Sequence, residues 1–257
     1  MFETRKIKLN DMEICYIDNY TKDKADQKTL LFVHGWGADK YNLQGIYSSL
    51  QHDFRIVSVD LPGFGESDNP HDTIGSIEYA DYINEFVKKT GIKQVIYIGH
   101  SFGGKIGIIT SVKYPELIEK LVLIDSTGIR ARRYPAWYFK VYSFKIMKFF
   151  LQNVIKSEDS VLKLKERFGS VDYKNAGVMR DIMVKNVSED FTDYLTEISC
   201  PVFIYWGEKD GDTPLWMAKK MNRLIQDSGL YVVKNGGHFS FLDDNRIISI
   251  IDNFART

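Results

Sequence analysis

A serine between two glycines directly follows a β-type run and has the setting of a catalytic nucleophile. Ser101 lies in the pentapeptide 99–103 (GHSFG), and the apolar run covers residues 95–98. In a sharp strand-to-helix turn, the residues two before and two after the nucleophile crowd each other, and glycine at both positions relieves that clash. The pattern occurs by chance in roughly one chain in ten of this length. Whether Ser101 is a nucleophile therefore depends on whether the chain also supplies a base, an acid and oxyanion donors.

A serine nucleophile needs a base, and His238 has the best setting among the five histidines of the chain. It lies in 235–239 (NGGHF) after the last β-type run, where glycines allow a loop to bring an imidazole over the strand ends. His100 is adjacent to Ser101 in a tight turn and is expected to project away from it. The other three lie in a strand-ending loop or in polar stretches and show no connection to the serine: His34, His52 and His71.

An imidazole base needs a carboxylate at Nδ1, which holds the correct tautomer and stabilises the developing positive charge. Asp210 follows a β-type run and precedes His238, which gives the chain order nucleophile, acid, base. Asp212 in the same loop and Asp125 at the end of another run are alternatives, although such residues are more often found in turns and helix caps. We favour Asp210 as the acid.

Acyl transfer also needs two donors aimed at the oxygen that becomes negative. The backbone N–H of Phe102, at the start of the helix after Ser101, is one candidate, and the positive end of that helix adds to its effect. The other is the N–H of Trp36 in 34–37 (HGWG), where two glycines let a loop turn its amide inward. Considered alone, that tetrapeptide would be interpreted as a generic glycine turn.

Short β-branched runs recur along the chain with helical segments between them. This pattern predicts a mostly parallel sheet covered by helices on both faces. The stretch 7–17 alternates and carries a polar break at Asn10 and Asp11, which predicts an antiparallel edge hairpin. The predicted parallel strands cover residues 30–33, 56–59, 95–98, 121–124, 202–205 and 230–233.

Two stretches carry apolar residues at helical spacing. One helix begins at Ser76 and is closed by Gly91. Its predicted buried face consists of Ile77, Ala80, Ile83 and Val87. The last helix of the chain has its apolar residues at Ile247, Ile250, Ile251 and Phe254.

Residues 127–197 interrupt this rhythm, because they contain no β-type run and only aromatic, basic and helical sequence. We therefore predict one α/β core made of residues 1–126 and 198–257, with 127–197 inserted as a helical cap. Basic and aromatic residues are interleaved in 130–150 without any acidic residue. The simplest interpretation is an amphipathic cap whose aromatic side chains line an apolar pocket. The candidate substrate-binding residues are Tyr134, Trp137, Tyr138 and Phe239.

The basic residues of the cap leave two sharper interpretations open. They could dock an acidic acyl carrier or a CoA tail, or they could contact anionic membrane lipid. The chain as a whole has 34 basic and 34 acidic residues and a net charge of zero. A nucleic-acid partner is therefore not expected.

Cofactor and metal motifs are weak in this chain. Residues 60–68 (DLPGFGESD) contain Gly-x-Gly but lack the third glycine of a dinucleotide site. The two cysteines, Cys15 and Cys200, lie far apart and offer no metal spacing. We expect no cofactor and no metal. The charged N-terminal residues and the lack of an 18-residue apolar run lead us to expect a soluble cytoplasmic protein.

Five motifs in the right order together resemble the α/β-hydrolase superfamily: residues 31–37, 60–68, 99–104, 207–214 and 237–239. The resemblance implies an eight-stranded sheet, a triad of Ser101, Asp210 and His238, and oxyanion donors at Trp36 and Phe102. Haloalkane dehalogenases and epoxide hydrolases of this fold carry an aspartate at the elbow, so the serine speaks against both. One departure is Lys105, where a less polar residue is the norm, and we expect its side chain to reach solvent.

The resulting functional hypothesis is hydrolysis of a carboxylic ester, or of a thioester, through an acyl-enzyme on Ser101. The substrate would be a small molecule or an acyl chain. The same triad also supports carbon–carbon bond hydrolysis and acyl transfer to an acceptor other than water. A non-catalytic small-molecule receptor is the alternative from a different class.

Overall fold

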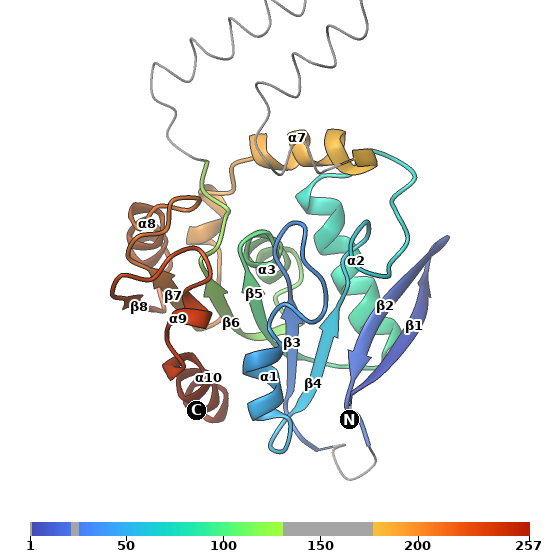
Figure 1. Cartoon of the computed structure of the whole chain (residues 1–257), viewed down its shortest axis with the longest axis horizontal. Helices are drawn as coiled ribbons and strands as arrows, with labels where there is room; N and C mark the ends of the chain where they lie inside the picture. The colour runs from blue at the N-terminus through green and yellow to red at the C-terminus, as the bar shows by residue number, and fades with distance from the viewer. Residues whose placement is uncertain (1, 22–25, 131–176) are drawn as a thin grey trace, which may run out of the picture. The chain divides into compact units, whose positions relative to one another are not determined.

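The protein is built on one eight-stranded sheet (Figure 1). The computed structural model describes residues 2–21, 26–130 and 177–257. The strands are ordered β1-β2-β4-β3-β5-β6-β7-β8. β2 pairs antiparallel with both β1 and β4, and the other neighbours pair in parallel. The predicted α/β fold with a mostly parallel sheet is therefore confirmed, as is the antiparallel hairpin at its edge.

Each predicted run lies within an observed strand. The strands are β1 Glu3–Leu9, β2 Met12–Asp18, β3 Thr29–Val33, β4 Arg55–Val59, β5 Val95–His100, β6 Ile118–Ile124, β7 Val202–Gly207 and β8 Ser228–Val233. The central strands are buried along their whole length, since helices cover both faces. This explains why their sequences are continuously apolar rather than alternating.

The helices cover the sheet and connect its parallel strands. The α-helices are α1 Gln44–Leu50, α2 Ser76–Lys89, α3 Phe102–Lys113, α7 Arg180–Ser188, α8 Trp216–Leu224, α9 Ser240–Asp243 and α10 Arg246–Arg256. The short 3₁₀ helices are η3 Gly177–Met179 and η4 Asp193–Thr196. Within the described ranges, none of the helices could span a lipid bilayer.

Alternate side chains of each strand serve opposite faces of the sheet. Ile96 and Ile98 belong to the hydrophobic core that also contains buried residues of α1 and α10. Tyr97, between them, points to α3 on the other face. There Gly107 allows close packing, because a Cβ at that position would lie 2.6 Å from the Tyr97 ring.

The two predicted amphipathic helices form, with one error in the buried face of α2. Ile77 is 37% exposed, so its assignment to the core is wrong. The buried face instead includes Tyr79 and Phe86, together with the predicted Ala80, Ile83 and Val87. In α10, Ile247 and Ile251 are buried as expected, and the neighbouring apolar residues are partly buried against the same core.

The chain divides into two compact units, Met1–Arg130 with Lys185–Thr257 and Ala131–Val184. Most of the second unit lies outside the described residues, so the predicted cap boundaries at 127 and 197 remain a prediction. Within the first unit, the N–H of Phe191 donates to the carbonyl of Gly128 at 2.9 Å. The segment that leaves the core and the segment that returns to it are therefore joined at their bases.

The order of the strands places β3 and β5 side by side although the chain visits β4 between them. Loops at the carboxyl ends of such neighbouring strands diverge, and ligands of open α/β sheets bind where they do. The turn from β5 into α3 is tight: a Cβ at Gly99 would lie 2.6 Å from the backbone of Gly103, and one at Gly103 would lie 2.3 Å from Val33 O. Glycine at both positions is thus a steric requirement.

We predict that Gly103→Ala destabilises the protein by ~3 kcal/mol or more, because the added methyl group meets a main-chain carbonyl that cannot move independently. Gly45→Ala is the matched control: it is an exposed helical position where an added Cβ would meet no atom within 4 Å, and the substitution should stabilise by about 0.5–1 kcal/mol. Urea unfolding measures both. Equal unfolding midpoints for the two variants would contradict the packing argument.

Candidate active site

Ser101 occupies the strained turn between β5 and α3. Its backbone has φ 50° and ψ −111°, a conformation that non-glycine residues rarely adopt. Hydrogen bonds hold this backbone on both sides, since Ser101 N–H donates to Ile124 O and Ser101 O accepts from Thr127 N–H. Strain that the surrounding structure maintains in this way is typical of functional positions.

The Ser101 hydroxyl lies beside the imidazole of His238. The distance from Ser101 Oγ to His238 Nε2 is 3.0 Å. On the other side of the ring, His238 Nδ1 lies 2.8 Å from Asp210 Oδ2. Ser101, His238 and Asp210, which come from distant segments of the sequence, therefore form a chain of two hydrogen-bond contacts. Nδ1–H donates to the carboxylate, which leaves Nε2 free to accept a proton from the serine.

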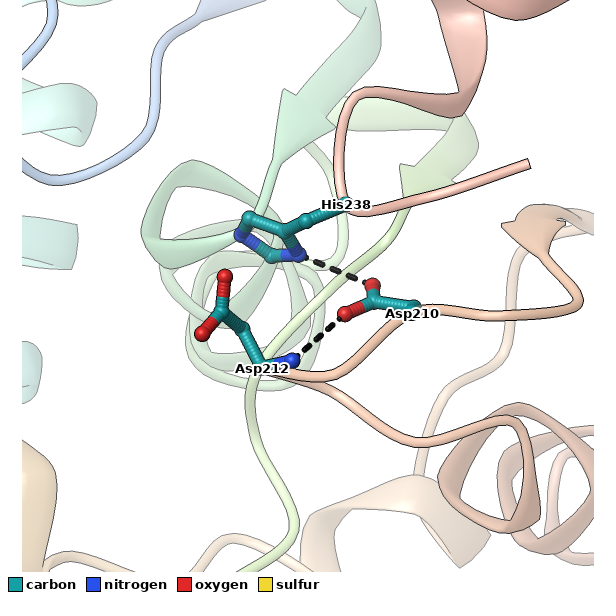
Figure 2. A group of neighbouring side chains, drawn as sticks. All are labelled: Asp210, Asp212 and His238. Atoms are coloured by element: carbon teal, nitrogen blue, oxygen red, sulfur yellow. Dashed lines mark hydrogen bonds and ion pairs between the residues drawn. The ribbon is translucent and has the colours of Figure 1, made fainter.

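Asp210 is held rigidly in the loop after β7. Its Oδ1 accepts the N–H groups of Asp212 and Thr213, each at 2.8 Å, and its Oδ2 also accepts the Thr213 hydroxyl at 2.6 Å. Figure 2 shows the contacts of Asp210 with His238 and with the Asp212 backbone. Because its oxygens are saturated with donors, the carboxylate presents one fixed direction to the imidazole.

The electrostatics of the pair favour an ionised acid and a basic imidazole. Burial opposes charge on both groups, but their mutual hydrogen bond outweighs it. The result is that the pKa of His238 is raised and the pKa of Asp210 is lowered. The hydrogen bonds from Thr213 add to the lowering at Asp210.

The two rival carboxylates have other positions. Asp212 is exposed and contributes its backbone N–H to Asp210. Asp125 is fully buried at the end of β6, where Oδ1 accepts Gly207 N–H at 2.8 Å and Oδ2 accepts Ser240 N–H at 2.9 Å. Asp125 thereby connects the end of β7 to the first residue of α9, two positions after His238. Burial raises the pKa of Asp125 to about 7.

The group Asp210, Asp212 and His238 also has the residue types of a metal site, with ligand atoms within 4.8 Å of one another. The donor set does not fit a metal ion well. Asp210 already accepts from the imidazole, from a hydroxyl and from two backbone N–H groups. These contacts suit a carboxylate that orients a histidine.

Trp36 and Phe102, the two proposed oxyanion donors, come from the loops after β3 and β5. Among the described residues, no acceptor takes a hydrogen bond from either backbone N–H. Their rings pack edge to face with centroids 5.5 Å apart, and Phe64 packs against Trp36 at 4.9 Å. The two loops are therefore locked together by aromatic contact.

Buried polar contacts that the sequence analysis missed hold the Trp36 loop. His34 Nδ1–H donates to Gly35 O at 2.7 Å, and His34 Nε2 accepts the Leu61 N–H at 3.0 Å. Lys40 Nζ donates to Asp60 Oδ2 and to Glu66 Oε1, both at 2.8 Å. Burial disfavours the Lys40 ammonium, but these hydrogen bonds outweigh it and raise its pKa. The only sequence signal was the acidic character of 60–68, and it did not identify the partner.

Lys105 corrects another expectation. It was expected to reach solvent, yet the residue is only 4% exposed. Its Nζ donates to Asn186 O at 2.7 Å, lies 3.5 Å from Glu189 Oε2 and lies over the Phe102 ring. The segment that returns to the core covers this part of α3, and burial lowers the pKa of Lys105 to about 8.

The candidate substrate-binding residues are only partly described. Phe239 is 48% exposed, and its ring centroid lies 5.5 Å from that of His238. This leaves an apolar surface directly beside the His238 imidazole. Tyr134, Trp137 and Tyr138 lie outside the described residues, and their role stays a prediction.

Comparison with known proteins places the chain in a family. Residues 28–245 match the family model described as alpha/beta hydrolase fold, so the chain belongs to the α/β-hydrolase family. It is 24% identical over 241 residues to the "uncharacterized hydrolase YugF" of Bacillus subtilis (strain 168), covering 87% of each chain. It is also 24% identical over 237 residues to a pimeloyl-[acyl-carrier protein] methyl ester esterase of Vibrio atlanticus (strain LGP32), covering 84% of this chain and 89% of the relative.

Solved structures agree with that fold. A membrane phospholipase A matches with a TM-score of 0.77 at 22% identity, over 100% of this chain and 87% of the other. A thermophilic esterase from Thermogutta terrifontis matches with a TM-score of 0.72 at 20% identity, over 99% and 98% of the two chains. At these identities the likeness concerns the fold alone.

We predict that Asp125→Asn lowers the free energy of unfolding by about 1–3 kcal/mol, because an amide can accept only one of the two buried N–H groups. Asp212→Asn, at an exposed position of the neighbouring loop, is the control and should change stability little. Urea unfolding at pH 8, where Asp125 is ionised, measures the difference. Wild-type stability of Asp125→Asn would contradict a bracing role for this carboxylate.

Proposed function

We propose that the protein hydrolyses a carboxylic ester, or a thioester, through an acyl-enzyme on Ser101. The observation that carries the proposal is the unbroken contact from Ser101 Oγ through the His238 imidazole to Asp210. A hydroxyl becomes a competent nucleophile when a neutral imidazole accepts its proton and a carboxylate stabilises the resulting imidazolium. The directions of the pKa shifts at His238 and Asp210 suit these roles.

The mechanism has two halves that use the same groups. Ser101 Oγ attacks the ester carbonyl while His238 Nε2 takes the hydroxyl proton, and the N–H groups of Trp36 and Phe102 stabilise the oxyanion. His238 then gives the proton to the departing alkoxide. In deacylation, His238 takes a proton from water, the resulting hydroxide attacks the acyl carbonyl, and the proton returns to Ser101 as the acid leaves.

Relatives and apolar surroundings support an ester of an acyl chain or a small molecule. The Vibrio relative is named as a methyl ester esterase, and a further relative from Psychrobacter immobilis is named as a lipase. The ring of Phe239 provides apolar surface beside the base, and the rings of the two proposed oxyanion donors, Trp36 and Phe102, pack against each other. Docking of an acyl carrier or of anionic lipid by the basic residues of 130–150, like the expected cytoplasmic location, remains a prediction.

We predict that a fluorophosphonate probe labels the wild-type protein once, at Ser101, and that Ser101→Ala neither reacts nor hydrolyses p-nitrophenyl esters. The reason is that this hydroxyl lies against Nε2 of the imidazole base. Mass spectrometry of the labelled peptide identifies the site. Ser49→Ala, at an exposed position of α1, is the control and should react as wild type does. Labelling at another residue, or steady turnover by Ser101→Ala, would overturn the proposal.

The same assay separates the alternative functions. Rapid turnover across a panel of short and long p-nitrophenyl esters supports an esterase. Slow turnover of all esters by a protein that is labelled at Ser101 indicates a carbon–carbon hydrolase or an acyltransferase. Labelling without any steady-state product indicates a receptor.

We predict that kcat/KM falls as the pH is lowered, with a midpoint above about 6.5, the ordinary pKa of histidine. The base must be neutral, and its interaction with Asp210 raises its pKa, so protonation removes activity at a higher pH than for an isolated imidazole. Initial rates between pH 5 and 9 give the midpoint. In Asp210→Asn the midpoint should move to lower pH and kcat should fall on the order of 10⁴. An unchanged midpoint in that variant would contradict the assignment of the acid.

A further inference from the structure

His100 is buried at the end of β5, directly before the nucleophile, and has no part in the mechanism above. The residue is 2% exposed. Its Nε2 lies 2.9 Å from the main-chain oxygen of His238. A carbonyl oxygen only accepts hydrogen bonds, so Nε2 carries the proton of the neutral ring. His100 therefore donates to the backbone of the residue that acts as the base.

The other ring nitrogen of His100 is unpaired, which lowers the stability of the folded protein. With the proton on Nε2, Nδ1 is a bare acceptor, and it is buried without a hydrogen-bond partner among the described residues. A buried unpaired acceptor disfavours folding, and an apolar side chain of similar size would avoid that cost. The imidazole donates at Nε2 although its Nδ1 is unpaired, which points to a use for that donor.

The ring of His100 lies between the two loops that complete the site. On one side, a Cβ at Gly35 would lie 2.9 Å from His100 Nδ1, so the loop carrying Trp36 rests against the imidazole. On the other side, the ring centroids of His238 and Phe239 lie 5.1 and 5.2 Å away. His100 thus contacts both the base loop and the loop of the oxyanion donor.

His100 is not itself a proton carrier at the pH of catalysis. Burial lowers its pKa to about 4, and the ionisable groups that act on it are His238, Asp210 and His34. It is uncharged wherever His238 is neutral. Its contribution must therefore be geometric.

We propose that His100 is a positioning residue, whose Nε2–H holds the main chain of His238 so that the imidazole lies between Ser101 and Asp210. Two glycines precede the base, so the loop 235–239 has little stiffness of its own. The ring of His238 must satisfy a 3.0 Å contact on one side and a 2.8 Å contact on the other. The hydrogen bond from His100 restricts the backbone motion of His238 that would break these two contacts. The inference rests on the proposed function only for the role of His238 as the base.

Three substitutions of His100 distinguish the effect of its hydrogen-bond donor from the effect of its size. His100→Leu fills space without a donor. His100→Gln places an amide N–H₂ at the reach of Nε2, whereas the shorter side chain of His100→Asn reaches only as far as Nδ1. His52→Leu, at an exposed position away from these loops, is the control that should keep wild-type rates.

The first readouts are the rate of fluorophosphonate labelling at Ser101 and the steady-state constants for a p-nitrophenyl ester. In His100→Leu the labelling rate and kcat should fall by roughly 100-fold with KM little changed, because a small displacement of the base affects the chemical step. His100→Asn should be as slow, and His100→Gln should recover most of the rate. Wild-type rates in a folded His100→Leu, or equal rates in the glutamine and asparagine variants, would overturn the inference.

The second readout does not depend on turnover. An NMR titration of the His238 ring should give a pKa above about 6.5 in wild type and in His100→Gln, and a value closer to about 6.5 in His100→Asn. If wild type shows no labelling at Ser101, the proposed function fails, while this titration still decides whether His100 holds His238 against Asp210. Thermal unfolding shows which variants are folded. If His100→Leu is unfolded, the comparison of His100→Gln with His100→Asn tests the inference.

Discussion

The main-chain contact between the start of α3 and the end of β3 is the constraint on which the site depends. Gly103 packs so closely against Val33 O that no side chain fits, and Tyr97 Oη donates a hydrogen bond to Gly103 O at 2.8 Å. The first turn of the helix is therefore fixed in three dimensions. Because Ser101 directly precedes this turn and Phe102 begins it, backbone packing helps to set the positions of both residues.

The remaining parts of the site lie on loops, and buried polar side chains fix those loops. Asp125 holds the segment that follows His238, while Lys40 and Asp60 hold the loop that follows Trp36. A buried polar group disfavours folding unless its hydrogen bonds are made. Alternative loop arrangements, which would leave these groups unpaired, are therefore destabilised. Apolar packing alone would tolerate several such arrangements.

The sequence predicted those features that depend on neighbours along the chain. Apolar runs gave the strands, and glycines with a few reactive side chains gave Ser101, Asp210 and His238, which the structure brings together. It did not predict contacts whose partners are remote. Lys105 and the carbonyl that it binds are separated by 81 positions, and no local pattern reports that a returning segment covers the lysine. The same holds for Asp125, whose two N–H partners lie at the end of β7 and at the start of α9.

The hydrogen bond between Phe191 and Gly128 has a consequence for how this architecture varies. When the two ends of an inserted segment are adjacent in the parent fold, each doubling of its length adds only about 0.6 kcal/mol to the entropy cost of closing the chain. The core can therefore accept inserted segments of different size and sequence at this point without a change in its own folding. One continuous stretch of chain can therefore be exchanged at this junction while the loops that carry Ser101, Asp210 and His238 keep their anchors in the core.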